Sequence, residues 1–279
     1  MGDFAQAVHY GKRSLGPLSR RLPFLAKNAQ RLWLCRHGET AGNAHGLVQG
    51  SGLDLPLNEK GQQQAQKLGQ ALASFQFDVV ASSDLCRAVE TAAAVAAFQP
   101  PTYYGMMDPA LREMHFGELE GMPIATVKGS GQMSRVQDRW AEGELNVSWP
   151  GIGGESASGV ARRGQRGLLA LLDGADEELG GKRPKNVLVV AHGRFNKLVI
   201  SSLLRGNAGS WGEIEQDNTC VNILERTVPD ADGTHNDGVW HARVLNDTGH
   251  LPQRLVNTSA ASSDRSSLYT SASHNPDGS

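Results

Sequence analysis

One stretch of the chain decides the fold: Leu32-Trp33-Leu34-Cys35-Arg36-His37-Gly38-Glu39-Thr40. Its apolar first half predicts a short buried strand that ends abruptly at Arg36. Ligand sites in open α/β sheets lie just beyond the carboxyl ends of such strands. An arginine, a histidine and a glycine at that point supply a permanent cation, an imidazole and a flexible backbone. The stretch therefore predicts a site that captures a phosphate group, with His37 placed to attack it.

A second apolar run, residues 77–82, is followed by polar residues and then by an alanine-rich stretch. This pattern predicts a strand that leads into a helix, with Ser83 or Asp84 as the residue that caps the helix. Arg87 then lies in the first turn of that helix. A second arginine is therefore expected just beyond the end of a strand.

Two more segments add a carboxylate and a second histidine. Residues 111–121 offer Glu113 among apolar residues and glycines, although Glu118 and Glu120 are carboxylates of the same stretch. Residues 187–191 predict a further buried strand, and His192 follows its end.

These four segments, in this order, resemble the histidine phosphatase superfamily, also called the phosphoglycerate mutase-like family. The resemblance covers roughly residues 31–246. It implies a three-layer α/β sandwich, with a mainly parallel central sheet flanked by helices. It also implies phosphoryl chemistry through a phosphohistidine intermediate. The core positions match the family pattern, so we expect an active enzyme rather than a non-catalytic phosphate-binding scaffold.

The resemblance gives each core residue a role. His37 matches the nucleophile that forms the phosphohistidine. The rest of the phosphate site is matched by Arg36, Arg87 and His192. Glu113 matches the position that supplies the proton donor in most members of the family.

Residues that follow the first segment are candidates for substrate binding. Asn43 lies where the family often places a residue that contacts phosphate. A glycine-rich loop, residues 49–58, borders the substrate entrance in the family, which makes Gln49 and Gly50 candidates. The alternative is that Gln49 is simply a polar side chain that faces solvent in this loop.

The same residue types suit phosphoryl transfer on physical grounds. Arginine holds phosphate oxygens through charge-assisted hydrogen bonds, and the transfer asks mainly for positioning and charge stabilisation. The attacking histidine must be neutral, with its other ring nitrogen donating to a backbone carbonyl. A carboxylic acid such as Glu113 can protonate the leaving alkoxide and then activate water. This scheme requires no metal and no cofactor.

Taken one at a time, these residues also have ordinary structural explanations. Arg36 and Arg87 could pair with surface carboxylates, whereas His37 and His192 could be hydrogen-bonded histidines at strand ends. Glu113 could belong to a solvated acidic loop. The functional interpretation is favoured because all of these explanations would have to hold together.

Composition excludes several classes of protein. The chain has 279 residues, 39% hydrophobic and 20% charged, which suffices for one large α/β domain. A formal net charge of −2 gives no basic field for nucleic acid, and no apolar stretch is long enough for a membrane span. The expected partner is a small phosphorylated substrate.

The three cysteines lack the spacing of metal ligands and predict reduced thiols: Cys35, Cys86 and Cys220. Cys35 and Cys86 each precede an arginine of the predicted site. Redox control and simple packing are the two interpretations. We expect no metal site.

The two ends of the chain differ from its centre. Residues 1–30 are basic and poor in acids, which predicts a flexible cytosolic extension, with an organelle transit peptide as the alternative. Residues 31–254 form the expected phosphatase domain. Residues 255–279 are dominated by small polar residues and predict a disordered tail. We therefore expect a cytoplasmic protein.

Inside the domain, periodicity predicts helices at residues 59–75, 160–179 and 195–204, and two antiparallel final strands at 218–224 and 239–245.

Residues 122–155 are the least patterned internal stretch, where the family places a cap over the active site. The stretch runs into Pro150-Gly151-Ile152-Gly153-Gly154-Glu155-Ser156, which resembles the phosphatase branch more than the glycolytic mutases. Trp140 and Trp149 either line the site or pack the cap. We expect this stretch to set substrate specificity.

The function that the sequence favours is metal-independent hydrolysis of a small phosphorylated metabolite, such as a sugar phosphate or a phosphoglycerate-like acid. A phosphoglycerate mutase would use the same core residues. A phosphatase for phosphoserine or phosphothreonine in proteins is the third possibility.

Overall fold

The computed structural model describes residues 22, 24–100, 103–174, 181–228 and 238–256. Most of the predicted leader (residues 1–21 and 23) and of the predicted tail (residues 257–279) lies outside these residues. The flexibility expected of both, and the division of the chain at residues 30 and 254, therefore stay predictions.

A six-stranded sheet forms the centre of the molecule, in the order β3-β2-β4-β1-β5-β6. The strands are β1 (Ala29–Arg36), β2 (Val79–Ser82), β3 (Tyr103–Met107), β4 (Asn186–Ala191), β5 (Val221–Thr227) and β6 (Val239–Asp247). The pairs β1–β4, β2–β4 and β2–β3 are parallel, whereas β5 is antiparallel to β1 and to β6. The predicted mainly parallel sheet with an antiparallel final pair is confirmed.

Strand β1 is buried on both faces, as its apolar sequence predicted. Leu32 and Leu34 belong to one hydrophobic core, whereas Trp33 and Cys35 belong to the other. The strand begins at Ala29, so Ala29 and Gln30 are buried strand residues although the sequence analysis assigned them to the leader.

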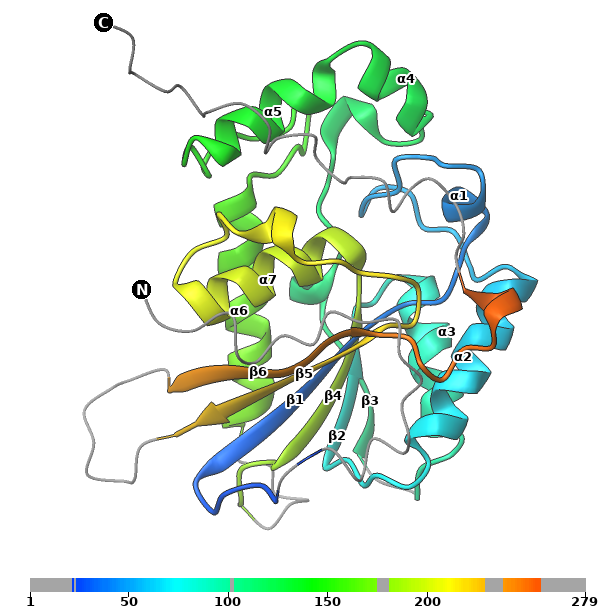
Figure 1. Cartoon of the computed structure of the whole chain (residues 1–279), viewed down its shortest axis with the longest axis vertical. Helices are drawn as coiled ribbons and strands as arrows, with labels where there is room; N and C mark the ends of the chain where they lie inside the picture. Colours follow the sequence, from blue (N-terminus) through cyan, green and yellow to red (C-terminus); the bar gives the residue numbers. More distant parts are fainter. Residues whose placement is uncertain (1–21, 23, 101–102, 175–180, 229–237, 257–279) are drawn as a thin grey trace, which may run out of the picture.

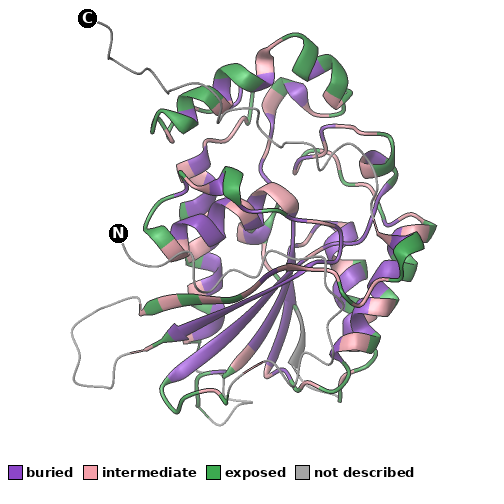
Figure 2. Ribbon diagram, in the orientation of Figure 1, coloured by how far each residue is buried: buried purple, intermediate pink, exposed green. Residues whose placement is uncertain are grey.

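Helices cover both faces of the sheet, as Figure 1 shows. On one face α2 (Glu59–Leu72) and α3 (Cys86–Ala96) bury their apolar residues against Trp33 and Cys35. On the other face α6 (Ala157–Asp173) and α7 (Gly193–Arg205) bury theirs against Leu32 and Leu34. The predicted helices are present, and most of their ends differ from the prediction by at most three residues. The exception is the end of α6 at Asp173, because residues 175–179 of the predicted helix lie outside the described residues. In Figure 2 strands β1 and β4 are almost wholly buried, which marks the sheet as the centre of both cores.

The remaining helices are short: α1 (Ala41–Ala44), α4 (Ile124–Gly129), α5 (Gln132–Ala141), and the 3-10 turns η2 (Pro109–Leu111), η3 (Gly117–Leu119), η4 (Trp211–Glu213) and η5 (Gln253–Leu255).

The start of α3 corrects one detail of the sequence analysis. The N-cap is Leu85, which makes no side-chain cap, rather than Ser83 or Asp84. The chain stays extended through Leu85, and the Asp84 carboxylate binds Arg112 instead. Arg87 lies in the first turn of the helix as predicted.

Residues 122–155 hold α4 and α5, which stand above the sheet layers at the top of Figure 1. The Trp140 ring packs edge-on against Trp149 and Trp211, with ring centroids 5.3 and 5.9 Å away. Trp140 and Trp149 are both buried. Of the two roles considered for these tryptophans, the structure therefore shows packing within the molecule. That this segment covers the active site stays a prediction.

Candidate active site

Four of the predicted residues meet at the carboxyl ends of three neighbouring parallel strands. Arg36 is the last residue of β1 and His37 follows it. His192 follows β4, and Arg87 lies in the first turn of α3, close behind β2. Because the three strands are adjacent in the order β2-β4-β1, their ends deliver these side chains to one place.

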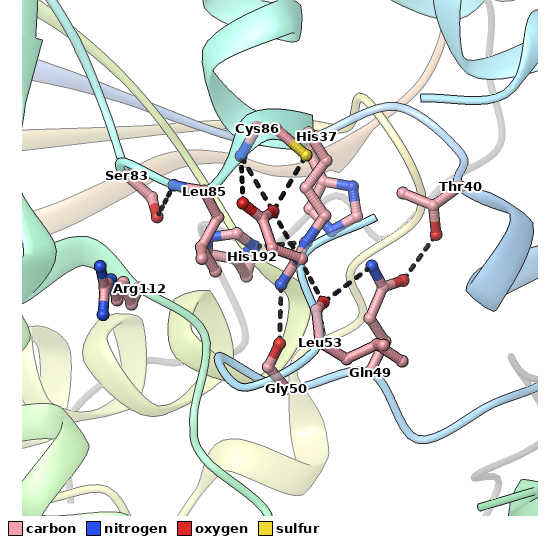
Figure 3. A network of polar contacts seen from close by, with 12 residues as sticks. His37, Thr40, Gln49, Gly50, Leu53, Ser83, Leu85, Cys86, Arg112 and His192 are labelled. Atoms are coloured by element: carbon pink, nitrogen blue, oxygen red, sulfur yellow. Dashed lines mark hydrogen bonds and ion pairs between the residues drawn. The ribbon is translucent and has the colours of Figure 1, made fainter. Parts of the chain in front are cut away.

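The two histidines lie side by side, as Figure 3 shows, with ring centroids 5.2 Å apart. His37 is buried, and its Nδ1 lies 2.7 Å from the carbonyl oxygen of Gly38. A carbonyl only accepts, so Nδ1 carries the proton and Nε2 keeps a lone pair. Burial, followed by the charges of Arg87 and Arg36, holds the pKa of His37 well below its ordinary value. The ring is therefore a neutral imidazole.

His192 has the opposite tautomer. Arg87 Nε donates a hydrogen bond of 3.2 Å to Nδ1 of His192, so the ring proton of His192 sits on Nε2. That Nε2 atom is buried and has no hydrogen-bond partner in the described part of the chain. Burial, together with the charge of Arg87, lowers the pKa of His192 well below its ordinary value.

The Arg87 side chain is fully buried, and each of its three guanidinium nitrogens donates one hydrogen bond. Its Nη1 donates to the carbonyl of Leu53 and its Nη2 to the carbonyl of Gly50, each at 3.1 Å. Asp54 lies 3.6 Å from Nη1. Each Nη atom also carries a second N–H, which can donate to an anionic ligand.

Arg36 adds a second guanidinium. Its Nη1 donates to the carbonyl of Gln216 at 2.7 Å. Its Nε is buried and makes no hydrogen bond with the described residues. A Cβ at position 193 would lie 3.2 Å from this Nε, so Gly193 leaves room for the guanidinium.

Glu113 lies at the start of α7, the helix whose N-cap residue is His192. Its Oε1 accepts the N–H groups of Met114 and Phe195, both at 2.8 Å, and its Oε2 accepts that of Arg194 at 3.0 Å. A helix N-terminus is a favourable place for a carboxylate.

The neighbouring carboxylates lie elsewhere. The Glu118 side chain is exposed, and Glu120 accepts the N–H of Phe116. Among the described residues, Glu113 is the carboxylate of this stretch that binds the first turn of α7.

The three predicted substrate-binding residues are found around this cluster. Asn43 forms a capping box with Thr40, and its Oδ1 accepts from Asn218 at 3.3 Å. Gln49 accepts from Thr40 at 2.6 Å. Gly50 contributes the carbonyl that Arg87 binds. Their roles in substrate binding stay predictions.

Comparisons with known proteins agree with this geometry. The family described as the histidine phosphatase superfamily (branch 1) matches residues 32–234. The chain belongs to this superfamily. Within it, the glucosyl-3-phosphoglycerate phosphatase of Mycobacterium tuberculosis is 34% identical over 185 residues, which cover 66% of this chain and 79% of that protein. Phosphoglycerate mutase-like protein 4 of Arabidopsis thaliana is 32% identical over 235 residues, covering 83% and 91%.

A solved structure shows the same fold. The mycobacterial glucosyl-3-phosphoglycerate phosphatase in complex with inorganic phosphate has a TM-score of 0.62 and 28% identity, covering 80% of this chain and 100% of that one. The family match and the phosphatase relatives indicate that this histidine phosphatase is a hydrolytic enzyme that acts on phosphorylated compounds.

Sequence reasoning missed several residues that support the site of this histidine phosphatase. Thr91 accepts the N–H of Gly38 at 3.0 Å and donates to the carbonyl of Arg87 at 2.8 Å. Asn218 donates to the carbonyl of His37 at 3.0 Å. Thr91 follows Arg87 by one helical turn, a spacing that could have indicated it. Asn218 precedes a strand far along the chain, and no local signal points to it.

The cysteines are free, and their environments do not favour the thiolate. Cys35 and Cys220 are buried, which raises the pKa of both thiols. Partial burial and the nearby Asp54 raise the pKa of Cys86 to about 12. Because the thiolate is the species that oxidises, this counts against redox control.

Within the described ranges, no group of three or more metal-binding side chains gathers in one place. Nor does that part of the chain contain a helix long and apolar enough to cross a membrane.

Proposed function

We propose that this protein hydrolyses phosphomonoesters of small metabolites through a phosphohistidine on Nε2 of His37, without a metal ion. The observation that carries the proposal is the pair of opposite histidine tautomers. His37 keeps a lone pair on Nε2, whereas His192 keeps a proton on Nε2 with no protein partner in the described chain. One ring is therefore suited to attack phosphorus, and the other to donate to a phosphate oxygen.

The surrounding groups supply the charge that phosphoryl transfer needs. Arg36 and Arg87 bring two guanidinium groups to the same strand ends, and His192 adds a neutral donor. Preorganised donors in a buried site stabilise developing negative charge more strongly than water does. These three side chains would hold the three non-bridging oxygens of the phosphoryl group.

In the first step, Nε2 of His37 attacks phosphorus and the ester P–O bond breaks. The bonding electrons go to the leaving oxygen, which takes a proton from Glu113. In this step Glu113 is the carboxylic acid, with its proton on Oε2, the oxygen that accepts a single N–H from the described residues. In the second step, the Glu113 carboxylate accepts a proton from water. The resulting hydroxide attacks phosphorus and the P–N bond breaks, which releases inorganic phosphate and restores both residues.

The proposed substrate is a sugar phosphate or a phosphoglycerate-like acid. The Mycobacterium tuberculosis relative is named for such a compound, glucosyl-3-phosphoglycerate. The Arabidopsis relative is named phosphoglycerate mutase-like, which supports mutase activity as the second candidate.

The test is an activity assay of the purified full chain in chelator with a panel of phosphorylated metabolites that includes both monophosphoglycerates. We expect release of inorganic phosphate without isomerisation. Interconversion of the two phosphoglycerates with little phosphate release would favour the mutase. Activity that requires an added divalent metal would contradict the metal-independent scheme.

We also propose a cytoplasmic location and no nucleic-acid partner. All three cysteines are free, as is typical of a reducing compartment, and the net charge is −2. Fractionation of cells that express the full chain tests the location, and import into an organelle would contradict it.

A further inference from the structure

The loop that carries Glu113 has little secondary structure of its own. It runs from the end of η2 at Leu111 to the start of η3 at Gly117. Backbone carbonyls in such a segment need donors from elsewhere. Any displacement of this loop would also move the Glu113 carboxylate relative to α7.

Arg163, on α6, supplies these donors. Its Nη1 donates to the carbonyls of Ala110 and Arg112, both at 2.8 Å, and its Nη2 donates to the carbonyl of Glu113 at 3.1 Å. Nε and the second N–H of Nη2 bind Glu155 at 2.8 and 2.9 Å. An arginine has five N–H donors, so this side chain is fully committed to the loop and to Glu155.

Glu155 holds the other side of the same loop. Its Oε2 accepts the N–H of His115 at 2.9 Å, and its own N–H donates to the carbonyl of His115 at 3.0 Å. The backbone is therefore held on both sides of the Glu113 side chain. Arg163 binds the carbonyls up to and including that of Glu113, and Glu155 binds His115, two residues further on.

The same arginine also contacts the helix that holds the carboxylate. Helices α6 and α7 approach closely at Gly164, where a Cβ would lie 2.7 Å from the Phe195 ring. The guanidinium carbon of Arg163 lies 5.6 Å from the centre of that ring. The N–H of Phe195 donates to the Glu113 carboxylate. Arg163 therefore contacts both the loop that carries Glu113 and one of the residues that bind the Glu113 carboxylate.

We propose that Arg163 and Glu155 are positioning residues for Glu113, which hold its loop so that the carboxylate stays at the start of α7 beside His192. This inference rests on the proposed function, in which Glu113 is the proton donor. The pair does not touch the reacting atoms in this account. It acts by fixing the position from which the proton is delivered.

The test compares two substrates that differ in their need for that proton. p-Nitrophenyl phosphate has a leaving group that departs without protonation, whereas glycerol 1-phosphate has an alkoxide that requires it. Lysine keeps the charge at position 163 but has neither the fork nor five donors. We expect Arg163→Lys to lower kcat/KM for glycerol 1-phosphate by about 10- to 100-fold, the effect of a small misplacement, and for p-nitrophenyl phosphate far less.

Three further variants make the test decisive. Arg162→Lys is the matched control, because Arg162 is the exposed neighbour on the same helix, and it should leave both substrates unaffected. Glu155→Gln should reproduce the selective loss while keeping Arg163. In a Glu113→Gln background, Arg163→Lys should have almost no further effect on glycerol 1-phosphate, since no proton donor remains to be positioned.

Equal losses on both substrates in Arg163→Lys and Glu155→Gln would overturn the positioning role, because they would reflect a smaller folded fraction. The failure of the underlying function looks different. If Glu113→Gln itself lowered kcat/KM equally for both substrates, the proton-donor role of Glu113 would be wrong, and the positioning role with it.

Discussion

Arg87 donates a hydrogen bond from Nε to Nδ1 of His192, and the two atoms are 3.2 Å apart. This contact fixes the proton of His192 on Nε2, where it can serve as a donor to an anion. It also joins a residue of α3 to a residue that follows β4, so the site depends on the arrangement of two strand ends.

Arg87→Lys tests this contact. A lysine cannot donate at once to His192 and to the carbonyls of Leu53 and Gly50, so both the tautomer of His192 and the 49–54 loop would lose their support. We expect kcat/KM to fall by about 100- to 1,000-fold, the typical effect of losing one preorganised donor. Steady-state kinetics measures this, with circular dichroism as the control for folding. Near-normal kinetics would place Arg87 outside the site.

Gly50→Ala tests the close packing of that loop. A Cβ at this position would lie 2.1 Å from Oε1 of Glu120 and 2.5 Å from the carbonyl of Met114, so the loop must move. We expect a loss of about 1–3 kcal/mol in the free energy of unfolding and a fall in activity, because the Gly50 carbonyl binds Arg87. Gly129→Ala is the control, since nothing lies within 4 Å of its Cβ position. Denaturant unfolding that shows the two variants equally stable would contradict the packing.

His250 predicts a pH dependence of stability. Burial lowers the pKa of His250 from 6.5 to about 4. Between these two pH values the unfolded chain binds a proton that the folded chain does not bind, so stability falls as the pH falls from 6.5 to 4. Above pH 6.5 this residue makes no pH-dependent contribution.

His250→Gln removes this titration. We expect the slope of unfolding free energy against pH between 4 and 6.5 to decrease by up to about 1.4 kcal/mol per pH unit. Denaturant melts across this range measure it. An unchanged slope would show that His250 titrates normally in the folded protein.

Cys86 should not act as a redox sensor. Its thiol donates to Asp54 at 3.0 Å, and the raised pKa of about 12 leaves very little thiolate near neutral pH. We expect peroxide or iodoacetamide at neutral pH to leave the activity almost unchanged over minutes. Rapid inactivation that Cys86→Ser prevents would reverse this conclusion.

The parts of the site that follow strands could be predicted from the sequence. The apolar runs before His37 and His192 predict buried parallel strands, and the carboxyl ends of such strands lie at one edge of a sheet. Glu113 could not be separated from Glu118 and Glu120 in this way, because the choice depends on which carboxylate the first turn of α7 receives.

Other features depend on contacts between distant segments. In the sequence, Arg163 has the pattern of an ordinary polar residue on a helix. Its contact with the Glu113 loop depends on the packing of α6 against α7. The N-cap residue of α3 was predicted wrongly, because the Asp84 side chain binds Arg112. This partner is distant in the sequence, so local propensity cannot indicate it.

The most direct test of the account is to trap the phosphorylated enzyme. The purified protein, kept in chelator, is mixed with a phosphomonoester that it hydrolyses in the activity assay. The reaction is quenched in alkali within milliseconds and analysed by peptide mass spectrometry. We predict a phosphorylated peptide whose modified residue is His37, and its absence, together with loss of turnover, in a folded His37→Ala variant. Phosphate found on another residue, or full turnover by His37→Ala, would contradict the central claim.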